Sequence, residues 1–201
     1  MHGLGRTARR LYDWVLGWAG SPYALAALAV LSFAEASFFP VPPDVLLIAM
    51  CLGSRGRSFW FAGVCSIASV FGGLAGYGIG AFLWGHVDQF FYSYIPGFTP
   101  ARFEQVRALY LSWGIAIVFT AGFSPIPYKL FTIASGVMAM PLLPFLAASA
   151  VSRSARFFLV AGLIYKLGDP VKVFIDKYFN WLALAFSVLL VGGFVVLKWL
   201  L

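Results

Sequence analysis

The stretch Phe33-Ala-Glu-Ala-Ser-Phe-Phe-Pro-Val-Pro-Pro-Asp44 lies in one of the most apolar regions of the chain, yet it carries two carboxylates, Glu35 and Asp44. Three prolines lie between them: Pro40, Pro42 and Pro43. Proline removes a backbone donor and clashes with the preceding helical turn. A charged side chain at the centre of a bilayer costs roughly 2.5–3.5 kcal/mol on insertion scales. The stretch therefore predicts a broken helical segment rather than a straight membrane span.

The same pattern recurs 85 residues later. Pro40-Val-Pro-Pro-Asp44 is followed by an apolar run, and so is Pro125-Ile-Pro-Tyr-Lys129. The first copy carries an acid where the second carries a base. Two interrupted apolar segments at corresponding positions in two halves of a chain are typical of a transporter binding site.

Composition places the chain in a membrane. Of its 201 residues, 62% are hydrophobic and 10% are charged, whereas charged residues make up about 25% of ordinary soluble domains. The net charge of +7 favours contact with anionic lipid surfaces over nucleic acid in a protein this apolar. Cys51 and Cys65 lack metal-ligand spacing and are interpreted as small buried side chains.

The chain in order predicts a single all-α integral membrane domain, residues 1–201, built from two repeats and a final helix. Each repeat holds an amphipathic helix, a broken hairpin and a span. In the first repeat, about residues 6–85, these are 6–18, 22–52 and 58–85. In the second, about 99–165, they are 99–111, 112–140 and 142–165. The C-terminal span is expected at about 181–200.

Charge placement favours hairpins that are re-entrant, each dipping into the membrane and returning to the same side. The N-terminal arginines and the Arg55/Arg57 turn then share one face with the later lysine-rich loop, as the positive-inside rule requires of the cytoplasm. A straight-through segment at 22–52 would separate them. The two hairpins would enter from opposite faces, which is an inverted repeat. We expect a multi-pass protein of the bacterial cytoplasmic membrane with a cytoplasmic N-terminus.

Glycines at four-residue spacing, Gly72, Gly76 and Gly80, predict a face that another helix can approach closely. The sequence leaves open whether that partner is internal or belongs to a second subunit of a homo-oligomer. A dinucleotide-binding loop is set aside because no strand precedes these glycines.

Five ionisable residues fall at bilayer depth: Glu35, Asp44, Lys129, Arg153 and Arg156. Such charges must be paired or line a wet cavity, so they are candidate functional residues. Desolvation favours the neutral form of a carboxyl group, which suits the two acids to proton coupling. The two arginines stand three residues apart and share a helix face. With Lys129 they could bind a phosphate-bearing headgroup, and Ser124 could add a hydroxyl.

Structural neutralisation is the alternative, with Asp44 and Lys129 as a pair at matching repeat positions. An enzyme is not expected, and neither is a metal or a cofactor. His2 and His86 lie at the periphery, and no metal-ligating or nucleophile–base constellation is visible.

At Glu35-x4-Pro40-x-Pro42-Pro43-Asp44 and Gly122-Phe-Ser-Pro-Ile-Pro-Tyr-Lys129 the sequence resembles the DedA family. This is the bacterial branch of the VTT, or SNARE-associated Golgi protein, superfamily, and the YqaA-like group is the most similar. The resemblance covers about residues 20–165. It implies opposed re-entrant hairpins and the movement of lipids across or between leaflets. For bacterial members it implies dependence on the proton motive force, with undecaprenyl phosphate as one proposed substrate.

The resemblance also implies roles for single residues. Glu35 and Asp44 match the essential acidic pair of the family, and Lys129 falls where many members have arginine. A further arginine near the start of the second motif is absent, with Phe123 in its neighbourhood. Arg153 and Arg156 are our candidates for the missing charge.

Three functions remain open. The first is a proton-coupled transporter or flippase for an anionic lipid. The second is an uncoupled phospholipid scramblase, in which the hairpins only thin the bilayer. The third is a membrane structural or assembly factor whose charges are neutralised internally. The expected partners are membrane lipids and protons.

Overall fold

The computed structural model describes residues 21–39, 41–94, 99–124 and 126–168. They form six α-helices and one short 3-10 turn: α2 (Ala24–Ser37), α3 (Asp44–Gly53), η1 (Arg55–Arg57), α4 (Ser58–Tyr94), α5 (Pro100–Phe123), α6 (Tyr128–Val137) and α7 (Leu142–Leu167). The amphipathic helix expected at 6–18 and the span expected at 181–200 lie outside the described residues.

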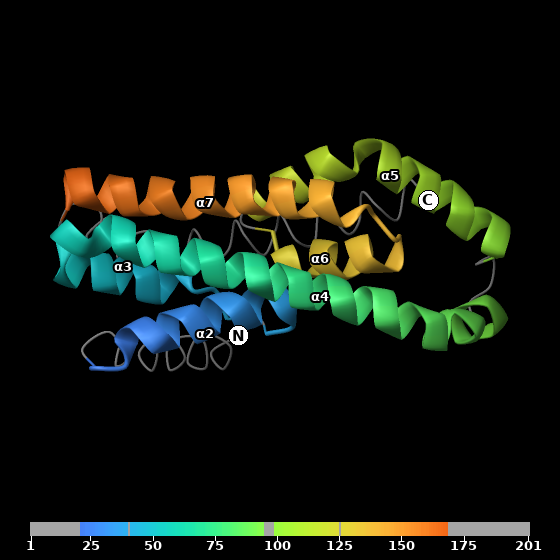
Figure 1. The fold of residues 1–201 in the computed structure, drawn as a ribbon, viewed down its shortest axis with the longest axis horizontal. Coiled ribbons are helices and arrows are strands. Elements are labelled where there is room, and N and C mark those ends of the chain that lie inside the picture. The colour runs from blue at the N-terminus through green and yellow to red at the C-terminus, as the bar shows by residue number, and fades with distance from the viewer. Residues whose placement is uncertain (1–20, 40, 95–98, 125, 169–201) are drawn as a thin grey trace, which may run out of the picture.

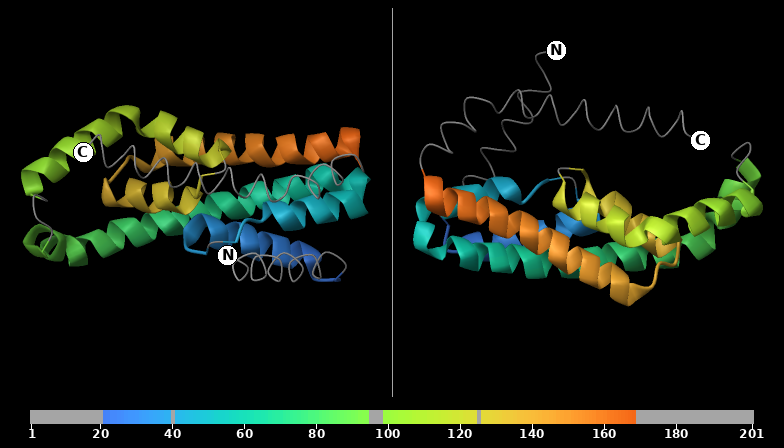
Figure 2. Two further views of the ribbon diagram at one scale, coloured as in Figure 1. Left: turned by 180° about the vertical axis from the view of Figure 1, so that it is seen from behind. Right: turned by 90° about the horizontal axis from the view of Figure 1, so that it is seen from above.

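Two helical hairpins pack on a pair of long helices. The hairpin of α2 and α3 lies towards one end of α4, and the hairpin of α5 and α6 lies towards the other (Figure 1). The closed ends of the hairpins face each other near the middle of the molecule, beside α4 and α7 (Figures 1 and 2). Residues that are 91 and 96 positions apart in the sequence, Phe38 with Lys129 and Ala36 with Thr132, are thereby in contact.

The breaks in both hairpins occur where the sequence predicts them. α2 ends at Ser37, where the amides of Phe38 and Phe39 both donate to the Ala34 carbonyl. Pro43 then precedes α3, and Pro127 precedes α6. Proline is tolerated at a helix start because its missing N–H would have no partner there. Proline therefore marks the start of the second helix in each hairpin.

Two helix boundaries correct the sequence-based expectation. α4 continues beyond Gly85 to Tyr94 as one helix of 37 residues. α5 is continuous from Pro100 to Phe123, so the amphipathic helix expected at 99–111 and the first arm of the second hairpin are a single element. The predicted division at residue 111 rested on a change of polarity. Polarity alone does not end a helix, and neither glycine nor proline lies between Pro100 and Gly114.

The glycine face packs inside the molecule. A side chain at Gly72 would meet the Phe33 backbone of α2, and one at Gly80 would meet the Ile133 backbone of α6. Gly76 lies against the Ala36 carbonyl and the Thr132 hydroxyl. One side of α4 thus holds both hairpins at close range, which confirms the predicted packing face and makes its helix partners internal.

Among the described residues, three helices are long and apolar enough to cross a membrane: Arg55–Tyr94, Pro100–Phe123 and Leu142–Leu167. α2 and α3 have 14 and 10 residues, fewer than the about 20 that a span requires. At about 1.5 Å per residue, α4 is roughly 55 Å long. It therefore extends well beyond a hydrocarbon core of about 30 Å.

Candidate functional site at the hairpin junction

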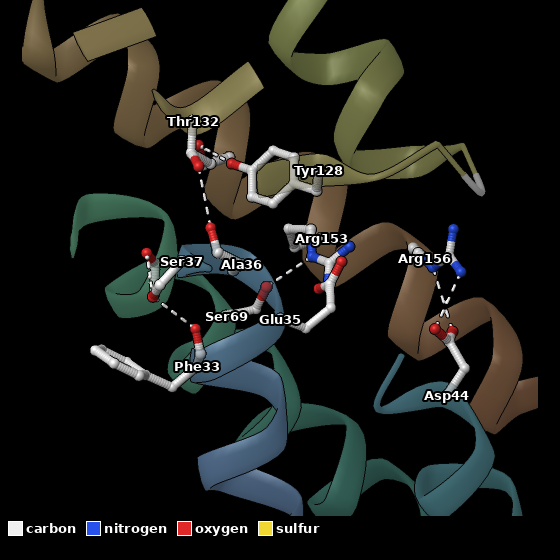
Figure 3. Close-up of polar contacts among 12 residues, drawn as sticks. Phe33, Glu35, Ala36, Ser37, Asp44, Ser69, Tyr128, Thr132, Arg153 and Arg156 are labelled. Atoms are coloured by element: carbon white, nitrogen blue, oxygen red, sulfur yellow. Dashed lines mark hydrogen bonds and ion pairs between the residues drawn. The ribbon is translucent and has the colours of Figure 1, made fainter. Parts of the chain in front are cut away.

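The first ion pair joins α7 to α2. Arg153 Nη2 donates to Glu35 Oε2 at 2.6 Å, and Arg153 Nε donates to Ser69 Oγ of α4 at 2.7 Å (Figure 3). The guanidinium also lies 5.0 Å from the Tyr128 ring centroid and 4.6 Å from that of Phe157. The arginine is enclosed by a carboxylate, a hydroxyl and two aromatic faces, which is the surrounding that a buried cation requires.

The second ion pair lies one turn further along α7. Arg156 binds Asp44 in bidentate fashion, with Nε–Oδ1 at 3.2 Å and Nη2–Oδ2 at 3.1 Å. Its Nη1 donates to the Ser124 carbonyl at 2.6 Å and to the Phe123 carbonyl at 3.4 Å. Asp44 begins α3 and Ser124 caps α5. One guanidinium therefore connects the closed ends of both hairpins.

The two pairs differ in burial. The side chains of Arg153 and Glu35 are 3% and 14% exposed, whereas those of Arg156 and Asp44 are 19% and 18% exposed. The difference is largest between the two arginines, and Glu35 and Asp44 differ little. The second pair is thus the more accessible one, and the first is the more strongly enclosed.

Lys129 lies at the same junction without a carboxylate partner in the part of the chain that the structure describes. Its Nζ donates to the Phe38 carbonyl at 3.4 Å, across from α6 to the end of α2. Asp44, which stands at the matching position of the first proline motif, is paired with Arg156 instead. Counting Glu35, Asp44, Lys129 and the two arginines as charged, the junction carries one net positive charge.

Hydroxyl groups tie the hairpins to each other and to α4. Thr132 Oγ1 donates to the Ala36 carbonyl at 3.0 Å, and Ser37 Oγ donates to the Gly72 carbonyl at 2.9 Å (Figure 3). The buried Tyr128 hydroxyl donates to Ser149 Oγ of α7. These bonds hold the backbone that presents Glu35 and Lys129, so the charged groups sit on a fixed frame.

Ser124 differs from these hydroxyl residues. Its Oγ is buried and has no hydrogen-bond partner within the described ranges, while its carbonyl accepts from Arg156. The next helix, α6, begins without a side-chain cap. The Leu130 amide in the first turn of α6 donates to the Pro127 carbonyl at 3.2 Å, so this helix start beside Lys129 is closed by backbone alone.

All five intramembrane charges predicted from the sequence gather at this junction, and Ser124 lies with them. Ser69, Tyr128 and Thr132 belong to the same frame, and sequence reasoning missed them. Tyr128 was inside the second proline motif, and Ser69 stands three residues before the first glycine of the packing face. Their position beside the motifs could be read from the sequence, but their bonding partners on other helices could not.

Metal binding has no support in the described residues, where no three His, Cys, Asp or Glu side chains cluster. His86 lies on an exposed part of α4, and its Nδ1 contacts the Phe82 carbonyl at 2.9 Å within its own helix. His86 is far in the sequence from the charged residues of the junction, and among the described residues its ring bonds only within its own helix.

The fold and its long apolar helices define a multi-pass helical membrane protein. The chain belongs to a bacterial family that includes an uncharacterised protein of Haemophilus influenzae, 38% identical over 188 residues, which cover 94% of this chain and 96% of the relative. An uncharacterised protein of Histophilus somni is 37% identical over 188 residues, covering 94% of this chain and 97% of that protein. No protein-family model matches the chain, and no solved structure matches it.

Proposed function

We propose that the protein moves an anionic lipid across the bacterial cytoplasmic membrane, coupled to protons through Glu35 and Asp44. The observation that carries the proposal is the junction itself. Five ionisable side chains from four helices meet where two opposed hairpins end inside an apolar bundle. Charges at membrane depth are costly and commonly mark substrate or proton pathways.

The proposed membrane placement follows the sequence-based expectation. We take the hairpins as re-entrant elements that enter from opposite faces, related as an inverted repeat. The short arms α2, α3 and α6 suit this arrangement because none is long enough to span. α5 is long enough, so we place only its first two turns, where Arg107 pairs with Glu104 at 3.2 Å, near the membrane surface.

Lys129 is the proposed first contact for a phosphate group. The arginines are already engaged by carboxylates, whereas the lysine holds only a long bond to a carbonyl. A phosphate that approached Lys129 would also meet the start of α6, which no side chain caps, and a helix N-terminus favours an anion. The net positive charge of the junction suits a ligand with one negative charge.

In this proposal the carboxylates and the lipid phosphate compete for the arginines, and proton uptake weakens the carboxylates. Protonation of Glu35 or Asp44 removes the negative charge that holds the facing guanidinium, which is then available to the phosphate. Arg156 also reaches the Phe123 and Ser124 carbonyls, close to where DedA-like motifs carry a further arginine. Loading of the lipid and uptake of a proton would thus favour each other.

A second candidate is supported by the same ion pairs. Because each arginine has a carboxylate, the charges could serve only to hold the hairpins to α7, in a structural or assembly factor. Buried pairs of this kind are weak evidence for stability alone. The two functions differ in whether wild-type protein moves lipid.

The test uses proteoliposomes with wild-type or Glu35→Gln protein at equal incorporation. The movement of a fluorescent polyprenyl phosphate and of a labelled neutral phospholipid is followed with and without a pH gradient. Gradient-stimulated movement of the phosphate lipid, lost in the variant, is the expected result. Equal movement of both lipids, indifferent to gradient and variant, would indicate an uncoupled scramblase. No movement by folded wild type would favour the structural factor.

A further inference from the structure

A second candidate binding surface lies on the second hairpin, mainly along α5. A groove of about 570 Å³ runs between α5 and α6, lined by Val106, Tyr110, Trp113, Ile117 and Thr120 of α5 and by Phe131 of α6. The lining positions on α5 recur at three- and four-residue spacing, so they follow one face of the helix. The groove is therefore shallow and open, and it extends along one face of α5 from Val106 to Thr120.

The lining of the groove selects an apolar occupant. The Tyr110 hydroxyl in its lining is already bonded to Ser135 Oγ at 2.9 Å and contacts the Phe131 carbonyl at 3.4 Å. Charged side chains do not line it. An occupant with polar atoms along its length would lose hydrogen bonds to water without replacing them. A hydrocarbon chain has no such loss.

The groove leads towards the charged junction. Thr120, its last member on α5, accepts at its carbonyl from the Ser124 amide at 2.9 Å. Ser124 in turn holds Arg156 through its own carbonyl at 2.6 Å. From Val106 to Thr120 the helix rises roughly 21 Å at about 1.5 Å per residue, more than half of a hydrocarbon core of about 30 Å. The groove therefore has the length for one lipid tail and a cationic end for its headgroup.

We propose that this groove binds a hydrocarbon tail of an anionic lipid while the phosphate lies at the Arg156–Lys129 end. The proposal rests on the proposed function for the identity of the headgroup, and it adds the place and the chemistry of tail recognition. It assigns recognition of the tail to one hairpin only, because the groove is formed by α5 and α6. Charge complementarity with the positive junction distinguishes this tail from that of a surrounding neutral lipid.

The test is photolabelling of the full-length protein in detergent micelles with a long-chain alkyl phosphate that carries a diazirine at the tail end. Labelled peptides are mapped by mass spectrometry. The alcohol of the same chain length serves as a competitor that lacks only the phosphate. We expect label on Val106, Tyr110 or Trp113, towards the end of the groove far from Arg156, displaced by unlabelled alkyl phosphate and weakly by the alcohol.

A matched pair of variants isolates the groove. Ala116 lines it and Ala108 does not, and both are exposed on the same helix. Ala116→Trp fills the groove and should lower the specific label about tenfold, the loss expected when roughly two methylene groups lose their contact. Ala108→Trp should label as wild type does.

Three results would overturn the inference. The first is equal labelling of the two variants. The second is label spread over Ile115 and Phe119 as strongly as over the groove. The third is groove labelling that appears only after removal of residues 181–201, since the occupant would then be the protein chain itself. Transport without groove labelling would refute this inference alone, whereas groove labelling without transport would refute the proposed function alone.

Discussion

Removal of Arg153 is the perturbation for which the structure gives the clearest magnitude. Its side chain is 3% exposed and faces Glu35, which is 14% exposed. Arg153→Met keeps an unbranched side chain of similar length but leaves the carboxylate without its cation. Breaking a buried ion pair from one side costs about 3–5 kcal/mol.

Glu35→Gln should cost less. The guanidinium keeps Ser69 at 2.7 Å and the ring faces of Tyr128 and Phe157, and the glutamine carbonyl can still accept a hydrogen bond. We expect a loss of about 1.5–3 kcal/mol, that of one hydrogen bond to a charged group. In the Glu35→Gln background, Arg153→Met no longer strands a charge. The double variant should therefore be more stable than the sum of the single losses predicts.

Two buried cysteines provide the assay. Cys51 and Cys65 are free and enclosed, so a thiol-reactive fluorogenic dye reports their exposure as the purified protein unfolds on heating in detergent. At about 2–4 °C per kcal/mol for a chain of this length, Arg153→Met should lower Tm by about 6–20 °C. Val151→Met, an exposed position on the same helix, is the control. Strictly additive losses, or an unchanged Tm for Arg153→Met, would refute the reasoning.

Three further predictions follow from local geometry. Gly80→Ala places a methyl group against the Ile133 backbone and should cost about 1–3 kcal/mol, whereas Gly78→Ala meets open space and should leave Tm unchanged or raise it; equal Tm values for the two would contradict the packing face. Thr99→Ala removes the cap that accepts from the Arg102 amide at 3.3 Å and should cost about 0.5–2 kcal/mol, measured with the same dye; a wild-type Tm would show that the cap is dispensable. Arg156→Lys keeps the charge but loses the bidentate contact with Asp44 and the Ser124 carbonyl, so Tm should fall by more than in an Asp44→Asn variant; the reverse order would refute the bridging role of Arg156.

Much of the fold is predictable because proline disfavours a helix through its own covalent structure, whatever surrounds it. Proline before α3 and before α6 interrupts a helix in any surrounding, so both hairpin turns could be placed from the sequence. The glycine face of α4 is predictable for a similar reason, since only a residue without a side chain permits such an approach. The ends of α4 and α5 were misjudged because the prediction followed polarity, whereas a helix continues through polar residues that lie on its exposed side.

The sequence predicted which charged residues form the candidate site, but it did not predict which of them pair with one another. Charges at membrane depth are conspicuous, and each must find a partner. Which partner depends on how α7 lies against two hairpins, across separations of 118 residues for Glu35–Arg153 and 112 residues for Asp44–Arg156. Periodicity carries no information at that range. Repeat symmetry suggested an Asp44–Lys129 pair, but the bidentate fork of Arg156 lies at the start of α3 and engages Asp44.

Lys129 provides the most direct test of the claim that the junction handles an anionic lipid. It lies at the junction with no carboxylate partner in the described ranges, so replacing it should disturb folding little. We would measure the movement of polyprenyl phosphate in proteoliposomes containing wild-type, Lys129→Arg or Lys129→Gln protein, matched for Tm and incorporation. The account predicts that Lys129→Arg retains movement and that Lys129→Gln loses most of it. Equal movement in all three would contradict a phosphate site at the hairpin junction.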